Sequence, residues 1–195
     1  MTSFVLATAN PDKAHEMRVV LESRGFTILE RPPEAPDVEE TEDTLEGNAL
    51  LKARALSAFT GQAAVADDTG LFVDALNGRP GVTSARYAGV GATYAANVAK
   101  LLGEMAGVPD EARGARLRTV IAVCYPDMRA LTVEGVLEGT IIRAPRGERG
   151  FGYDPVFRPD EIGDRTLAEL SASEKNALSH RALALHALAR ALSQE

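Results

Sequence analysis

The sequence has a single cysteine, Cys124, which excludes an intramolecular disulfide. This cysteine lies inside an apolar run, residues 119–125, where a small buried core residue is expected. No apolar run approaches the roughly 20 residues that a membrane-spanning helix needs. The first residues also lack the basic and apolar regions of a secretory signal. We therefore expect a protein of a reducing, cytoplasmic compartment with no membrane partner.

Basic residues are fewer than acidic ones, 21 against 28, so the formal net charge is −7 at pH 7. Proteins that bind nucleic acid stably usually carry a basic face, so this balance argues against such a partner. Acidic residues are dense over residues 30–46, whereas the cations of interest are scattered. These cations are Lys13, Arg86, Lys175, His180 and Arg181. A few of them, with a metal ion beside them, could hold an anionic substrate.

Hydrophobic residues make up 45% of the 195 positions, enough for a sizeable core, and no internal repeats interrupt the pattern. We expect one domain over residues 1–195, with two lobes around a central substrate cleft. Short apolar runs predict strands, and apolar residues at helical spacing predict helices. The predicted strands are 4–8, 26–29 and 63–66, continued by 71–76, then 117–125 and 130–137 joined as a hairpin. The fold class is therefore α/β, with a long twisted mixed sheet and flanking helices.

Helix boundaries are marked by capping signals. Thr44 is expected to begin a helix that Gly61 ends, and Thr93 to begin another that runs to Met105. Two capping boxes follow, at Thr166-x-x-Glu169 and Ser171-x-x-Glu174. The second is expected to open one long helix that carries Leu178, Leu185, Ala189 and Leu192 on one face.

A strand-to-helix turn at residues 8–13 combines a hydroxyl, an amide and a lysine. Its residues are Thr8, Ala9, Asn10, Pro11, Asp12 and Lys13. Backbone N–H groups at a helix start favour phosphate binding, although the glycines of a Walker loop are missing. Taken alone, a capped helix start with a solvated lysine explains the same residues.

Asp67 and Asp68 follow an apolar strand, at the position where ligands bind in open α/β sheets. Adjacent residues on a strand point to opposite faces, but at a turn both carboxylates can converge. Paired carboxylates favour a Mg²⁺ ion between them and substrate phosphates. A simple turn with a capping aspartate is the alternative.

Three further segments could carry chemistry. The run 38–41 supplies Glu39 and Glu40, although a solvated acidic loop looks the same. The segment 150–155 places aromatic rings that could stack a base between glycines that let backbone approach a ligand. The stretch 175–181 offers ammonium, imidazole and guanidinium donors, which suit a phosphate or a base edge.

Together these segments resemble one family, the inosine-triphosphate pyrophosphatases, also called Ham1-like. The matching blocks run in family order over residues 6–185, which is nearly the whole chain. They are residues 6–10 with Lys13 and Glu16, 39–41 with Thr44, 48–53, 66–71, 78–89, 150–157, and 166–170 with Lys175 and 179–181. One departure from the family is Gly47, where glutamate is common. Glu46 lies one position earlier on the expected helix, so its side chain would point in a different direction and would not replace that glutamate.

The resemblance implies roles for individual residues. Asp68 matches the family's catalytic base and a metal ligand, and Glu39 matches its second metal-binding carboxylate. Glu40 is ranked behind Glu39, because with two consecutive glutamates the alignment could shift by one residue. Thr69 keeps the hydroxyl of a family serine. Asp67 is the weaker candidate, with a supporting role at the metal. The substrate-contacting positions are Thr8, Ala9, Asn10, Pro11, Asp12, Lys13, Thr69, Phe151, Gly152, Tyr153, Asp154, Lys175, His180 and Arg181.

The resemblance also implies a reaction: Mg²⁺-dependent hydrolysis of dITP, ITP, XTP or dXTP to the monophosphate and pyrophosphate, by a homodimer. Water would attack the α-phosphorus, and His180 and Arg181 would read the 6-oxo group of the purine. A Maf-like pyrophosphatase acting on modified pyrimidine nucleotides is the enzymatic alternative. A non-catalytic nucleotide-binding module is the other, and it predicts the loss of a metal carboxylate or a phosphate lysine, neither of which is missing.

Overall fold

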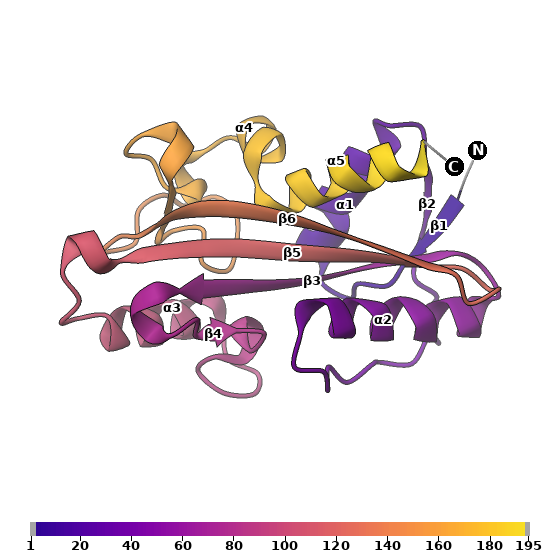
Figure 1. Cartoon of the computed structure of the whole chain (residues 1–195), viewed down its shortest axis with the longest axis horizontal. Coiled ribbons are helices and arrows are strands. Elements are labelled where there is room, and N and C mark those ends of the chain that lie inside the picture. Colours follow the sequence, from indigo (N-terminus) through magenta and orange to yellow (C-terminus); the bar gives the residue numbers. More distant parts are fainter. Residues whose placement is uncertain (1–2, 194–195) are drawn as a thin grey trace. The chain divides into compact units, whose positions relative to one another are not determined.

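The computed structural model describes residues 3–193, and these contain five α-helices and seven β-strands (Figure 1). The helices are α1 (Pro11–Glu22), α2 (Leu45–Thr60), α3 (Tyr94–Glu104), α4 (Ala172–Leu178) and α5 (His180–Leu192). The strands are β1 (Ser3–Leu6), β2 (Thr27–Leu29), β3 (Ala64–Val73), β4 (Pro80–Gly81), β5 (Gly114–Cys124), β6 (Ala130–Ile141) and β7 (Phe157–Pro159). The predicted α/β class is confirmed. None of the helices in residues 3–193 has the length and apolarity that crossing a bilayer requires.

The strands form one mixed sheet in the order β2-β1-β3-β5-β6-β7, with β4 paired to β3. β1 runs parallel to β2 and β3, whereas β4 and β7 run antiparallel to their partners. The predicted hairpin between β5 and β6 is confirmed. Its turn is closed by the Tyr125 N–H, which donates to the Arg129 carbonyl at 3.0 Å.

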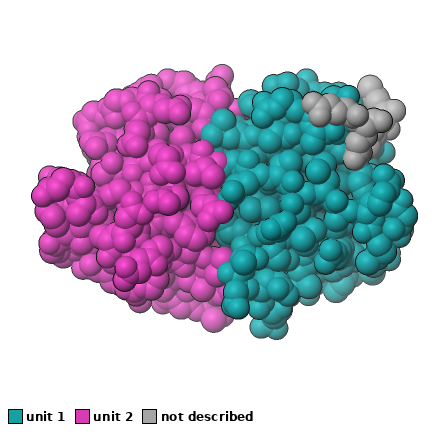
Figure 2. Space-filling view, viewed as in Figure 1, with its two compact units in different colours: residues 1–68, 119–135, 180–195 teal, residues 69–118, 136–179 magenta. Residues whose placement is uncertain are grey.

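The chain divides into two compact units, coloured separately in Figure 2. The first unit comprises residues 1–68, 119–135 and 180–195, and the second comprises residues 69–118 and 136–179. β3, β5 and β6 each contribute residues to both units. Each unit has a buried apolar cluster of its own.

In the first unit, helices cover both faces of the strands. Phe4 and Val65 belong to the apolar cluster formed with α1 and α5, whereas Val5 and Ala64 belong to the cluster formed with α2 (Figure 1). Side chains alternate between the faces of a strand. The alternation along β3 therefore assigns odd-numbered residues to the α1 and α5 face and even-numbered residues to the α2 face.

In the second unit, the amphipathic helix α3 packs its apolar side into the core. Val98, Leu101 and Met105 lie there with residues of β3, β5 and β6. Arg113 is buried in this unit and donates to the carbonyls of Met105 and Ile141 at 2.8 and 2.7 Å. It thereby joins the C-terminus of α3 to the end of β6, satisfying carbonyls that would otherwise be left without donors.

Local capping signals placed most helix ends correctly. Thr44 accepts a hydrogen bond from the Gly47 N–H, and Gly61 ends α2 in the left-handed conformation. Both predicted capping boxes are present. The first, however, opens only a 3₁₀ turn, and the predicted long C-terminal helix is wrong. Ser179 is extended, with φ −63° and ψ 153°, so the segment forms two helices, α4 and α5.

Candidate active site

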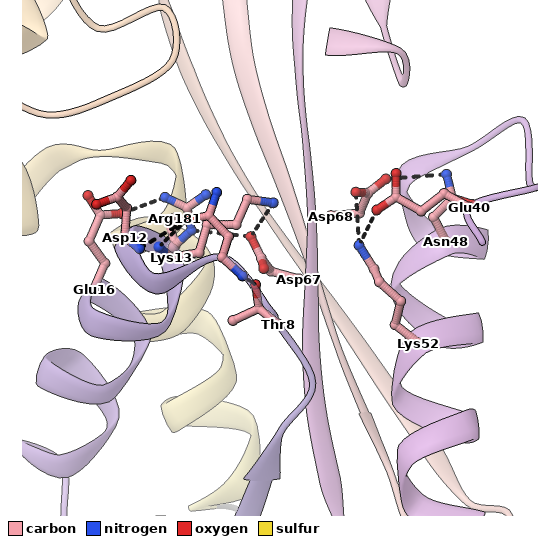
Figure 3. Close-up of polar contacts among 11 residues, drawn as sticks. Thr8, Asp12, Lys13, Glu16, Glu40, Asn48, Lys52, Asp67, Asp68 and Arg181 are labelled. Carbon is pink, nitrogen blue, oxygen red and sulfur yellow. Dashed lines mark hydrogen bonds and ion pairs between the residues drawn. The ribbon is translucent and has the colours of Figure 1, made fainter. Parts of the chain in front are cut away.

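Asp67 and Asp68 lie on opposite faces of β3 (Figure 3). β3 is one continuous strand from Ala64 to Val73, so no turn interrupts it at the two aspartates. The expectation that both carboxylates converge is therefore wrong, because consecutive strand residues alternate in direction. Both side chains are nevertheless buried, since helices cover both faces of the first unit. Each aspartate has its own set of charged neighbours.

On the α2 face, Asp68 accepts from two polar side chains, and Glu40 shares one of them. The Lys52 ammonium donates to Asp68 Oδ1 at 3.1 Å and to Glu40 Oε1 at 2.7 Å. Asn48, one helical turn before Lys52, donates to Asp68 Oδ2 over a long 3.4 Å. Asn48 also exchanges two hydrogen bonds with the backbone of Glu42, at 3.0 and 3.2 Å. One helix thus presents two donors to Asp68 and fixes the acidic loop beside it.

Burial and charge act against each other in this group. Burial raises the pKa of Asp68, the Lys52 charge opposes that rise, and Glu40 adds to it, leaving the pKa above its ordinary value. For Lys52, burial lowers the pKa, but the carboxylates of Asp68, Asp67 and Glu40 outweigh it and hold the pKa above its usual value. The positive charge of Lys52 therefore offsets the repulsion between the carboxylates of Asp68 and Glu40.

The acidic loop places Glu40, and not Glu39, beside Asp68. Glu40 is half-buried and bonded to Lys52, whereas Glu39 is exposed. No contact between Glu39 and Asp68 is present among the described residues. The preference for Glu39 as the second metal carboxylate stays a prediction, and the geometry favours Glu40.

On the α1 and α5 face, Asp67 meets two cations. Its Oδ2 accepts from Lys13 Nζ and from Arg181 Nε, each at 3.2 Å. Arg181 Nη1 also forms an ion pair with Glu16 of α1. The Asp67 side chain is 0% exposed and that of Arg181 is 2% exposed, while Lys13 retains 19%. A buried charge network therefore links α1, β3 and α5.

The charges of this network decide the ionisation of Asp67. Burial would raise the pKa of its carboxyl, but Lys13 and Arg181 hold the pKa well below its usual range. Burial likewise opposes the charge of Arg181, and Asp67 and Glu16 overcome it and raise the pKa of the guanidinium. Asp67 is thus a permanent anion between two cations.

The turn at residues 8–13 is a capped helix start. Asn10 Oδ1 accepts from the N–H groups of Asp12 and Lys13 at 2.9 and 3.2 Å, and Thr8 Oγ1 accepts from the Asn10 N–H at 3.1 Å. Pro11 occupies the first turn of α1, and Ala9 is exposed. Several N–H groups assigned to phosphate are therefore engaged by capping side chains. A phosphate at this turn would have to compete with the Asn10 amide oxygen.

In the second unit, Asp154 and Lys175 form a buried ion pair. Lys175 Nζ donates to Asp154 Oδ2 at 2.6 Å, with side chains 7% and 6% exposed. The same oxygen accepts from the Phe151 N–H at 2.9 Å. The Lys175 ammonium also lies 4.4 Å from the centre of the Phe151 ring. Glycine is required at position 150 for two reasons: its φ is positive, at 73°, and a Cβ would lie 2.1 Å from Asp154 Oδ2.

The aromatic residues of this segment differ in role. The Tyr153 hydroxyl donates to the Ser84 carbonyl at 2.9 Å inside the core of the second unit. The Phe151 ring is half-buried and lies 5.9 Å from that of Tyr94. Phe151 is therefore the better candidate for stacking a base. Gly152 beside it has a positive φ of 64°.

The predicted site residues thus fall into three groups. Asp68 lies on the α2 face, while Lys13, Asp67 and Arg181 lie on the α1 and α5 face. Buried His180 precedes Arg181 at the start of α5. The third group, Phe151 to Asp154 with Lys175, belongs to the second unit, as does half-buried Thr69.

Lys52 and Asn48 were not assigned roles from the sequence, although a signal was present. They are four residues apart on α2, a spacing that puts both side chains on one helix face. The departure at Gly47 also has a structural reason. A Cβ at Gly47 would lie 2.7 Å from Glu42 Cβ, and Glu46 instead accepts a bond from Thr132 at 2.9 Å.

Comparison with known proteins shows the family of this chain. The model of the Ham1 family matches residues 4–191. The chain belongs to the Ham1 family. A dITP/XTP pyrophosphatase of Bacillus licheniformis is 48% identical, with 100% of each chain covered, and one of Geobacter sulfurreducens is 50% identical, with 95% and 94% covered. A HAM1 protein structure from Coxiella burnetii aligns with a TM-score of 0.91 at 42% identity, covering 100% of both chains.

Membership of the Ham1 family decides against the Maf-like alternative, because the family match includes all three groups of site residues. Their donor chemistry also suits magnesium. Asp68 and Glu40 offer hard carboxylate oxygens and already share the Lys52 ammonium, so the pair holds a cation. Within residues 3–193, no three His, Cys, Asp or Glu side chains gather into a metal site. Two carboxylates, with substrate phosphates and water completing the shell, fit the usual binding of Mg²⁺.

Proposed function

We propose that this protein hydrolyses non-standard purine nucleoside triphosphates, namely dITP, ITP, XTP and dXTP, to the monophosphate and pyrophosphate. The observation that carries the proposal is the buried Asp68 carboxylate, which accepts from the Lys52 ammonium, to which Glu40 is also bonded. Such a group can hold a metal and take a proton from water. The two curated relatives named dITP/XTP pyrophosphatase, matched over 94% or more of each chain, support the substrate class.

The chemical step joins a water oxygen to the α-phosphorus and breaks its bond to the bridging oxygen of the β-phosphate. Asp68 accepts the proton of the attacking water at a carboxylate oxygen. Its pKa is raised by burial, which makes it a stronger base than an exposed aspartate, while Lys52 limits that rise. General-base assistance of this kind contributes about 10²–10⁴-fold to the rate.

Asp68 and Glu40 are the residues proposed to hold Mg²⁺, with Glu39 as the alternative to Glu40. When bound, the metal supplies charge neutralisation for the departing pyrophosphate. Lys52 lies between the two carboxylates, so a bound metal would share them with its ammonium. The Lys52 ammonium would also be available to a phosphate oxygen, a further reason to count it in the site.

The remaining cations are proposed to bind the triphosphate and the base. Lys13 and Lys175 are assigned to phosphates, and each is now paired with an aspartate. His180 and Arg181 are assigned to the 6-oxo group, which accepts hydrogen bonds where adenine presents a donor. Thr8 to Asp12, Thr69 and Phe151 to Asp154 complete the proposed substrate contacts.

We further propose that the active form is a homodimer that works in the cytoplasm. The family resemblance supports the dimer, and the single cysteine fits a reducing compartment. Light scattering after gel filtration tests the first point. A mass of one chain, 20.7 kDa, in an active preparation would contradict it.

Pyrophosphate release from ITP, dITP, XTP, GTP and ATP, with Mg²⁺ or with EDTA, tests the proposed function. We expect rapid release from ITP, dITP and XTP with Mg²⁺, little from ATP, and none with EDTA. A preference for ATP, or for modified pyrimidine nucleotides, would overturn the proposed substrate class. Full activity in EDTA would overturn the proposed metal.

A further inference from the structure

We propose that Asp67 is a positioning residue that holds Lys13 and Arg181 in place, and not a second metal ligand. The inference rests on the proposed function, because it gives the two cations a substrate to meet. Asp67 is adjacent in sequence to the proposed base Asp68, which invites a shared role. The structure separates them, since Asp67 points to the α1 and α5 face of β3 and Asp68 to the α2 face (Figure 3).

The contacts of Asp67 are those of an anchor. One oxygen, Oδ2, accepts from Lys13 Nζ and from Arg181 Nε at the same distance, 3.2 Å. The Asp67 side chain is fully buried, at 0% exposure, and strand β3 holds its backbone. A carboxylate fixed on a strand thus determines the positions of two long side chains that come from two helices, α1 and α5.

Lys13 gains most from such an anchor. Its side chain is 19% exposed, so it meets solvent in part, while its ammonium reaches the buried carboxylate. A free lysine side chain has rotamer entropy to lose when it is fixed. Because Asp67 already orders it, less of that entropy remains to be lost when a phosphate binds. Arg181 is held from both sides, by Asp67 and by Glu16.

Two roles for Asp67 predict opposite results for Asp67→Asn. If Asp67 only reduced the positive charge of the site, Asp67→Asn would make the site more positive. The anionic triphosphate would then bind more tightly, and the KM for ITP would fall. If Asp67 positions Lys13, the KM rises and kcat/KM falls despite the gain in positive charge. A displacement of about 1 Å in such a group can cost about 10²-fold. We expect a loss of about 10–10²-fold in kcat/KM.

A double-mutant cycle with Lys13→Met tests whether Asp67 acts through Lys13. Asp67→Asn should raise the KM for ITP strongly in the wild-type background and clearly less in the Lys13→Met background, where Arg181 alone is left for Asp67 to position. Equal increases in both backgrounds would overturn the inference, as would a fall in KM. Thermal unfolding of each variant shows whether it is folded. If Asp67→Asn does not fold, Asp67→Glu replaces it, and an unchanged KM and kcat there would equally refute positioning.

The Mg²⁺ requirement separates this inference from the proposed function. Asp67→Asn should leave the Mg²⁺ affinity of the nucleotide-free protein, measured by calorimetry, unchanged, while Asp68→Asn weakens it. A weakening by Asp67→Asn equal to that by Asp68→Asn would make Asp67 a metal ligand and overturn the inference alone. Full activity of Asp68→Asn would instead defeat the proposed function.

Discussion

Replacing Lys175 by methionine removes one charge of the buried ion pair in the second unit while keeping most of the side-chain volume. Asp154 is then left as a buried carboxylate that still accepts from the Phe151 N–H at 2.9 Å. Both side chains of the pair are at most 7% exposed, so water cannot replace the lost ammonium without rearrangement. Removing one partner of such a pair costs about 3–5 kcal/mol.

That cost corresponds to a fall in Tm of about 6–20 °C for a chain of this size. Differential scanning calorimetry of Lys175→Met measures it. The double variant Lys175→Met/Asp154→Asn removes both charges, so it should recover a large part of the loss. Arg165→Met is a matched control, because Arg165 pairs with Glu174 at 2.9 Å but the two side chains are 49% and 44% exposed. Such exposed pairs contribute about 0–1 kcal/mol.

Activity separates the structural part of Lys175 from its proposed phosphate contact. The double variant, though restabilised, should keep a raised KM for ITP, since the phosphate would still lack its cation. A Tm of Lys175→Met equal to that of the wild type would refute the reasoning about burial. A wild-type KM in the double variant would show that Lys175 does not contact the substrate.

Four other variants have defined expectations. Asp68→Asn should lower kcat at least about 10²-fold in the pyrophosphate assay while its Tm is retained, and a third of wild-type activity would reject Asp68 as the base. In the metal-free protein, ¹³C NMR should show a higher pKa for Asp68 in Lys52→Met and a lower one in Glu40→Gln, because Lys52 lowers that pKa and Glu40 raises it; shifts of the opposite sign would contradict the described contacts. Arg181→Ala should lose more kcat/KM on ITP than on ATP, and equal losses would mean that Arg181 serves the phosphates or the fold and does not read the base.

Local chemistry made much of the fold predictable. Thr44 and Gly61 bound α2 as expected, because a cap and a left-handed glycine act on the adjacent backbone. The break at Ser179 was not predictable in the same way. A serine inside a helical pattern carries no strong stop signal, and its extended conformation lies where the chain passes from the second unit to the first.

The site was predictable as a set of residues and less so as a geometry. Motif order identified Asp68, Lys13, Lys175 and Arg181, but not that the last three are each paired with an acid. Whether Asp67 and Asp68 converge depends on whether β3 ends there, and β3 continues because its downstream residues pair with β4. Such pairing joins segments that a local pattern does not connect.

Hydrolysis of ITP in H₂¹⁸O tests the central claim most directly, because it reports which phosphorus the water attacks. With Asp68 delivering water to the α-phosphorus, mass spectrometry should find one ¹⁸O atom in inosine monophosphate and none in pyrophosphate. The same incorporation pattern is expected for XTP. Label in pyrophosphate would mean attack at the β-phosphorus, and inosine diphosphate as the first product would mean attack at the γ-phosphorus. Either result would contradict the proposed mechanism.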